Sequence, residues 1–157
     1  MLNSITKGIA KVFGTKTEKD LKELTPYVAL INKEFDQLKD ITDDELRGKT
    51  TELKDIIKDH LKEIDDQLAS LHKQVEEDQS LDVHQKEEIF ASIDKLEANR
   101  DEELEKVLID ILPIGFAVVK ETARRLAENE KLVVSATAYD KEIASKKGNV
   151  TISGETA

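Results

Sequence analysis

The strongest fold signal in this 157-residue chain is the stretch IKDHLKEIDDQLASLHKQV at residues 57–75. Its apolar side chains alternate steps of four and three residues, which is the heptad spacing of a helix that pairs with another helix along a narrow seam. The seam consists of Ile57, Leu61, Ile64, Leu68, Leu71 and Val75. Burying a Leu or Ile side chain contributes roughly 1.5–3 kcal/mol, so the seam needs a partner helix.

A second striped helix follows a break at residues 79–82. Asp82 and Gln85 have the spacing of a capping box, and Arg100 and Glu103 interrupt the apolar stripe, so we expect the pairing to loosen there. The stripe consists of Ile89, Ile93, Leu96, Leu104, Val107, Leu108 and Ile111. A short turn between two such helices predicts an antiparallel helical hairpin. The alternative is a free-standing coiled-coil adapter or scaffold protein that uses the seam to dimerise.

The first helix of the hairpin has a clear start signal. Thr42 and Glu45 form a capping box, and Ile41 and Leu46 are placed for a hydrophobic staple around it. The helix is therefore predicted to run from about Asp43 towards Asp78.

Another helix is predicted upstream, with Thr15 or Thr17 as its N-cap. Pro26 falls inside its pattern and either sits in the first turns or kinks the helix. One face of this helix carries Leu21, Leu24, Val28, Ile31, Phe35 and Leu38.

The first fourteen residues form one short amphipathic stripe beside lysines. Its apolar members are Leu2, Ile5, Ile9 and Val12, and the nearby cations are Lys7, Lys11 and Lys16. One interpretation is a helix on anionic lipid or on a partner protein. The other is a terminal helix docked on its own domain, or a frayed tail.

Two changes of secondary structure are predicted in the last third of the chain. Pro113 disfavours α-helix at Leu112 and suits the first turn of a new helix, whose stripe is Phe116, Val119, Ala123 and Leu126. Residues 132–139 and 150–153 then resemble two short strands around a turn at 146–149, a small β-ribbon. The predicted fold class is mainly α: a long antiparallel, coiled-coil-like helical hairpin on a short helical base, with a β-ribbon near the C-terminus.

Composition narrows the possible functions. A formal net charge of −10 and a pI near 4.9 argue against nucleic acid as a partner, because no excess of cations is available for phosphates. With 37 % charged and 4 % aromatic residues, the chain suits exposed helices better than a thick core. No cysteine is present, which excludes thiolate chemistry and fits a reducing cytoplasm. We find no membrane-spanning stretch and no signal peptide, and expect the chain to be soluble by itself.

No catalytic, cofactor-binding or metal site is predicted. Gly48-Lys49-Thr50 matches the end of a phosphate loop, but Asp43 stands where the first glycine is needed. His60, His72 and His84 are twelve residues apart, and a His84–Glu88 pair alone makes a weak metal site. The paired carboxylates lie on predicted solvent faces beside lysines, where their pKa values have no reason to suit acid–base catalysis. They are Asp43-Asp44, Asp65-Asp66, Glu76-Glu77-Asp78 and Glu102-Glu103.

Three stretches resemble the amino-terminal end of the SecA family, the ATP-driven motors of bacterial protein export. They are KVFG at residues 11–14, TDDELRGKT at 42–50 and LPIGFAVVKETARR at 112–125. Family members typically join the second stretch to the third by a short link, whereas some fifty residues intervene here. We interpret these as a lineage-specific helical insertion.

The resemblance divides the chain into five parts. Residues 1–16 are an amphipathic N-terminal segment, 17–58 the helical base, 59–111 the inserted hairpin, 112–130 a helix leading towards the motor domain, and 131–157 a truncated β-ribbon insertion. The family's nucleotide-binding residues follow the helix that matches residues 113–125 and have no counterpart here. We therefore expect a truncated fragment without catalysis of its own.

The family's other properties are expectations for the parent protein. It uses ATP and Mg²⁺, acts on preproteins with a SecY-type channel and anionic lipid, and is cytoplasmic and peripheral on the inner membrane. A homodimer is a further partner that the resemblance implies. In the family the first helix contacts membrane, channel or a second protomer. The matching residues are Leu2, Ile5, Lys7, Ile9, Lys11, Val12 and Phe13.

Overall fold

The computed structural model describes residues 16–157, which form four helices. They are α2 (Lys16–Gln37), α3 (Asp43–Glu77), α4 (Val83–Glu128) and α5 (Ala138–Ala144). The mainly α class is confirmed. The contact residues predicted in the N-terminal segment, from Leu2 to Phe13, lie outside the described residues.

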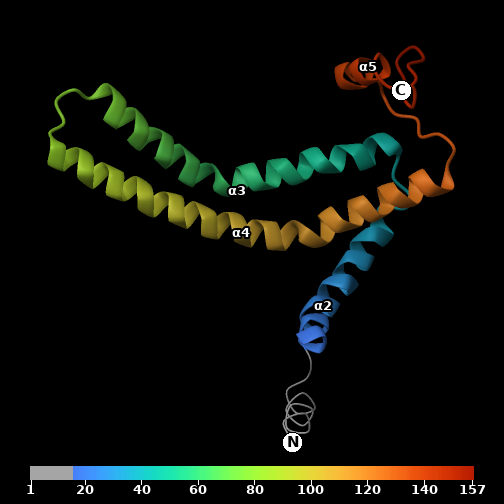
Figure 1. Ribbon diagram of the computed structural model, residues 1–157, viewed down its shortest axis with the longest axis horizontal. Helices are drawn as coiled ribbons and strands as arrows, with labels where there is room; N and C mark the ends of the chain where they lie inside the picture. Colours follow the sequence, from blue (N-terminus) through green and yellow to red (C-terminus); the bar gives the residue numbers. More distant parts are fainter. Residues whose placement is uncertain (1–15) are drawn as a thin grey trace, which may run out of the picture.

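The long helices α3 and α4 run side by side in opposite directions and form the predicted hairpin (Figure 1). Both predicted start signals are confirmed. Thr42 Oγ1 accepts the backbone N–H of Glu45 at 3.2 Å, and a Glu45 carboxylate oxygen accepts the Thr42 N–H at 2.7 Å. Asp82 and Gln85 exchange the equivalent pair, each at 2.9 Å. These bonds satisfy backbone donors that the first turn of each helix leaves free.

The predicted seam is the inner face of the hairpin. Every seam residue of α3 is half-buried or buried, and Leu61 is only 2 % exposed. Ile93 and Val107 of α4 are each 3 % exposed. The seam is therefore covered by a helix of the same chain.

Helix α2 crosses α4 at the base of the hairpin and projects away from it (Figure 1). The core cluster there consists of Leu38, Leu46, Ala117 and Val118, with Ile31, Phe35, Ile41 and Ile114 packed against it. The predicted staple residues Ile41 and Leu46 thus meet in this core. Thr17 lies inside α2, so it is not the N-cap, and Pro26 lies within the helix as well.

The predicted helix start at Pro113 is wrong, because α4 continues through it to Glu128. Proline inside a helix removes one backbone hydrogen bond and costs about 3 kcal/mol. Pro113 is itself buried, and the helix beyond it supplies Ala117 and Val118 to the core, so packing outweighs this cost. Figure 1 shows α4 bending in this part of its length, the usual consequence of an internal proline.

The predicted β-ribbon is also wrong. Within residues 16–157 there is no strand, and the only pairing is by isolated bridges, from Ser135 and Ser153 to Thr156. Thr137 and Asp140 form a capping box that starts α5, so the chain turns into a helix where the first strand was predicted. Gly154, at φ +62°, then helps the chain turn back so that residues 155–157 meet residues 134–136.

Of the helices in the described part, none combines the length and the hydropathy needed to cross a membrane.

Candidate docking site around Arg125

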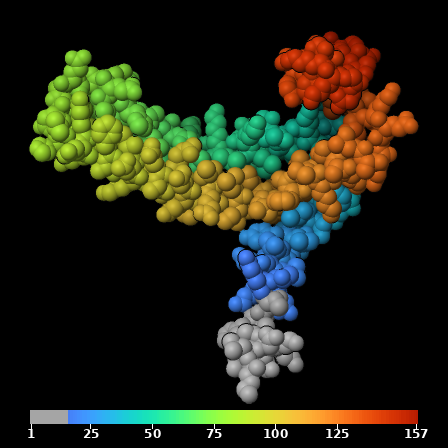
Figure 2. All heavy atoms as spheres, viewed as in Figure 1, coloured from blue at the N-terminus to red at the C-terminus, as the bar shows by residue number. Residues whose placement is uncertain are grey.

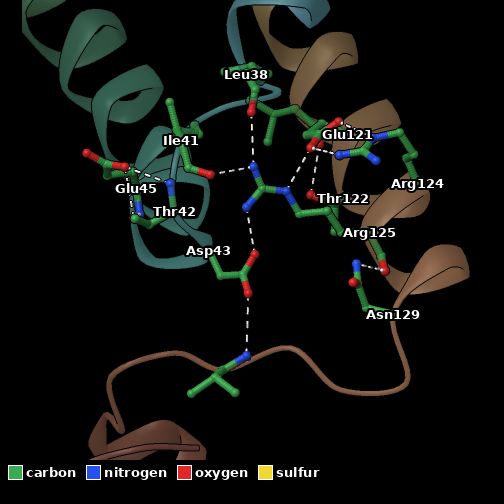
Figure 3. Close-up of polar contacts among 12 residues, drawn as sticks. Leu38, Ile41, Thr42, Asp43, Glu45, Glu121, Thr122, Arg124, Arg125 and Asn129 are labelled. Atoms are coloured by element: carbon green, nitrogen blue, oxygen red, sulfur yellow. Dashed lines mark hydrogen bonds and ion pairs between the residues drawn. The ribbon is translucent and has the colours of Figure 1, made fainter.

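Arg125 is the polar centre of the molecule and is 6 % exposed (Figure 3). Its Nε donates to Glu121 Oε1 at 2.7 Å, and its Nη1 donates to Asp43 Oδ1 at 2.6 Å. Its Nη2 donates to the carbonyl oxygens of Leu38 and Ile41, at 3.0 and 2.7 Å. One side chain of α4 thereby holds the α2–α3 turn and the first residue of α3.

Glu121 is fully buried beside Arg125. Arg124 also donates to it, from Nε at 2.8 Å and from Nη2 at 2.7 Å. These hydrogen bonds, first from Arg124 and then from Arg125, outweigh desolvation and lower the pKa of Glu121 to about 2. The hydrogen bond that Arg124 donates to Glu121 in turn raises the pKa of Arg124. Glu121 is therefore ionised at neutral pH and serves as a fixed acceptor for both arginines.

A second polar group joins the first turn of α3 to the segment after α4. Asp44 accepts from the backbone N–H of Ser135 at 3.0 Å and from its hydroxyl at 2.6 Å. Hydrogen bonding from the Ser135 hydroxyl, and then from its N–H, lowers the pKa of Asp44. Arg47 donates to Ser135 O at 2.6 Å and to Asp140 at 2.9 Å. The C-terminal segment is thus attached to α3 by charged side chains.

The hairpin is not open where its stripe is interrupted. Arg100 Nε donates to Asp65 Oδ1 at 2.5 Å, and His60 Nε2 lies 3.0 Å from Glu103 Oε2. The residues that interrupt the apolar stripe of α4 therefore make polar contacts across to α3.

The outer face of α4 is apolar and uncovered. The predicted stripe of this part of the helix lies in solvent: Phe116 is 58 % exposed, Val119 66 % and Leu126 63 %. Ala123 is exposed on the same face. The opposite face, which carries Ala117 and Val118, packs in the core, so this half of α4 is apolar on both sides.

The weak chemical motifs of the sequence do not come together. Lys49 lies inside α3 with its Nζ on Glu52 at 2.7 Å, far from the arrangement of a phosphate loop. His84 Nδ1 lies 3.7 Å from a carboxylate oxygen of Glu87. Across residues 16–157, no group of three or more His, Cys, Asp or Glu side chains is placed to hold a metal ion.

Sequence reasoning did not single out Arg125 or Glu121. A signal was available, because the two residues are four apart and one helical face therefore carries both of them with Ala117 and Val118. A charged pair on an apolar helix face indicates a buried ion pair.

Comparison with known proteins gives consistent matches. Residues 9–145 match the model of the SecA DEAD-like domain. The protein translocase subunit SecA of Cytophaga hutchinsonii is 49 % identical over 149 residues, and that of Amoebophilus asiaticus is 44 % identical over 151. These alignments cover 95 % and 96 % of this chain but only 13 % and 14 % of the relatives. No solved structure matches the chain.

Proposed function

Because this chain belongs to the SecA family of protein translocase subunits, we propose that it is a non-catalytic docking segment of such a translocase. The observation that carries the proposal is the doubly apolar half of α4. One face packs against α2 and α3, and the other presents Phe116, Val119 and Leu126 to solvent. The second face is the surface that docks onto the motor.

The solvent face of a surface helix is normally polar, so an exposed apolar face indicates a missing partner. Covering one large apolar side chain contributes roughly 1.5–3 kcal/mol, so three of them provide a substantial docking energy. The chain spans only 13 % of the first relative, and most of that protein lies outside the segment. The rest of the translocase is therefore the partner that this surface fits.

The activity of the whole protein is part of the proposal. It hydrolyses ATP with Mg²⁺ and moves preproteins through a SecY-type channel, as a cytoplasmic protein on the inner face of the membrane. Residues 1–16 touch anionic lipid, the channel or a second protomer. The residues proposed for that contact are Leu2, Ile5, Lys7, Ile9, Lys11, Val12 and Phe13.

Two observations support a structural rather than a catalytic role. All three nitrogens of the Arg125 side chain donate to protein groups, and the neighbouring Glu121 is ionised. The seam of α3 is covered by α4, so it is not available for the dimer that a coiled-coil adapter requires.

A chimera tests the proposal. This chain replaces the matching segment of the Cytophaga hutchinsonii relative, and Phe116→Ser, Val119→Ser and Leu126→Ser are introduced together. We expect preprotein-stimulated ATP hydrolysis to fall at least about tenfold, because the docking surface is lost.

The matched control changes exposed apolar residues elsewhere, Val83→Ser and Phe90→Ser on the hairpin, which are 72 % and 48 % exposed. This control should keep the activity of the unmodified chimera. Equal activity of the triple variant and the control would contradict the proposal, provided that both have the same helical circular dichroism signal.

A further inference from the structure

Residues 132–136, here called the strap, lie extended across the first turn of α3. Their exposure alternates: Leu132, Val134 and Ala136 are half-buried, whereas Val133 and Ser135 are exposed. This period of two is the pattern of a strand that places every second side chain against a surface. Within the described chain, however, no neighbouring strand lies on the α3 side of the strap.

Side chains of α3 take the place of that strand. Ser135 donates its N–H to Asp44 and accepts from Arg47, at 3.0 and 2.6 Å. The N–H of Val133 points to Asp43 Oδ2 at 3.4 Å. The first turn of α3 therefore binds main-chain groups two residues apart, which is how proteins recognise extended peptides with little regard to sequence.

The other edge of the strap is paired within the C-terminal segment. Val134 and Ala157 exchange two backbone hydrogen bonds, at 3.0 and 2.9 Å, and Ala136 N–H donates to Glu155 O at 2.8 Å. This pairing does not involve α3 or α4. The edge of the strap that faces α3 is therefore bound by side chains of α3 alone.

The half-buried side chains of the strap enter a groove between α3 and α4. Leu132 and Val134 line this groove together with Leu46, Val118 and Thr122. The groove lining therefore combines these apolar side chains with the charged residues Asp43, Arg47 and Arg125. An extended segment with apolar side chains at alternate positions fits both features.

The strap is held on the α3 side by exposed polar contacts from Asp43, Asp44 and Arg47. Helix α5 packs against none of α2, α3 and α4, and the C-terminal segment forms a separate lobe beside the start of α3 (Figure 2). Its link from α5 to α3 is the Arg47–Asp140 ion pair at 2.9 Å, which is partly exposed. Exposed ion pairs and hydrogen bonds each contribute little net stability, and a competing peptide can make the same main-chain contacts, so it can displace the strap.

We propose that the groove between the first turn of α3 and α4 is a binding site for extended peptides with apolar side chains at alternate positions. The strap occupies this site in cis. The inference goes beyond the proposed docking function and does not depend on it, because the groove and the outer face of α4 are different surfaces.

The experiment uses a fluorescent peptide with the sequence of residues 131–137, KLVVSAT, added to the full chain. In the variant Leu132→Asp/Val134→Asp the strap no longer fits the groove, whereas the residues of α3 and α4 that line the groove are unchanged. Fluorescence anisotropy should show that this variant binds the peptide at least about tenfold more tightly than the unmodified chain, because cis competition is removed. A peptide with Asp at the positions of Leu132 and Val134 should not bind.

A further change tests the main-chain contact. Adding Arg47→Ala to the opened variant removes the donor to the peptide carbonyl and should weaken binding at least about tenfold. Lys73→Ala, an exposed change on the same helix, is the matched control and should leave binding unchanged. Equal peptide affinity of the opened and unmodified chains, no binding by the opened chain, or no effect of Arg47→Ala would each overturn the proposal.

Discussion

At the scale of single residues, Arg125 shows how one buried cation organises an otherwise thin core. Its guanidinium is surrounded by two carboxylates and two backbone carbonyls, so each of its three nitrogens has a partner. Arginine suits this position because its planar fork of donors reaches several acceptors at once. The same site without the arginine would contain a buried carboxylate and two carbonyls that have lost a donor.

We predict that Arg125→Ala lowers the free energy of unfolding by about 3 kcal/mol, because it breaks a buried ion pair from one side. Arg125→Lys should recover only part of this loss, since one ammonium cannot reproduce the fork. Urea denaturation followed by circular dichroism measures both. Lys62→Ala, on the exposed side of α3, is the control and should leave the urea midpoint unchanged. If Arg125→Ala has the same midpoint as this control, Arg125 does not anchor the base.

Residue-scale features were predictable when they were local in sequence. The capping boxes at Thr42 and Asp82 involve residues three apart, and the structure contains both. The Arg125 cluster joins positions more than eighty residues apart, such as Asp43 and Arg125. Its existence depends on how α2 crosses α4, which spacing alone does not reveal.

At the scale of helices, the heptad pattern predicted the hairpin correctly, and two local rules failed. Proline was expected to start a new helix at Pro113, but the core contacts of Ala117 and Val118 maintain one continuous α4. The strand predicted through residues 132–139 does not form in the described chain, and a capping box of Thr137 and Asp140 starts α5 instead. That capping pattern has the same spacing as the one recognised at Thr42, so the sequence did contain the signal.

The hairpin seam leads to a prediction about α3. Leu61 is 2 % exposed, so Leu61→Ala removes buried methyl groups and leaves a cavity, which should lower the free energy of unfolding by about 3 kcal/mol. Ile56→Ala, on the neighbouring exposed side at 43 % exposure, should cost less than about 1 kcal/mol. Chemical denaturation of the two variants compares them directly. Similar losses for both would mean that Leu61 does not lie in the seam.

At the scale of the whole molecule, the chain consists of an arm, a crossing helix and a terminal lobe (Figure 2). The alignments with relatives cover 95 % of the chain and hence include most of the arm, so these relatives share it. The arm and the C-terminal lobe both begin at the base, where α2, α3 and α4 meet.

The choice between the two apolar faces of α4 could not be made from the sequence. Phe116, Val119, Ala123 and Leu126 have regular helical spacing and were the predicted stripe, yet Ala117 and Val118 form the core. Both faces are apolar, and only the position of α2 and α3 decides which one is covered internally. This ambiguity is itself informative, because a helix with two apolar faces needs two partners.

The central claim is that the outer face of α4 docks onto the rest of a translocase, and the rate of thiol labelling at Val119 tests it most directly. The chain has no cysteine, so Val119→Cys introduces a single reporter. Glu87→Cys, on the exposed side of the hairpin, is the control. Each variant is labelled with a maleimide, both in the isolated chain and in the full-length chimera whose other cysteines have been replaced.

In the isolated chain both thiols should react quickly, because both positions are exposed. In the full-length chimera we predict that labelling at position 119 slows by at least about tenfold, whereas labelling at position 87 keeps its rate. Equally fast labelling of position 119 in both proteins would contradict the account.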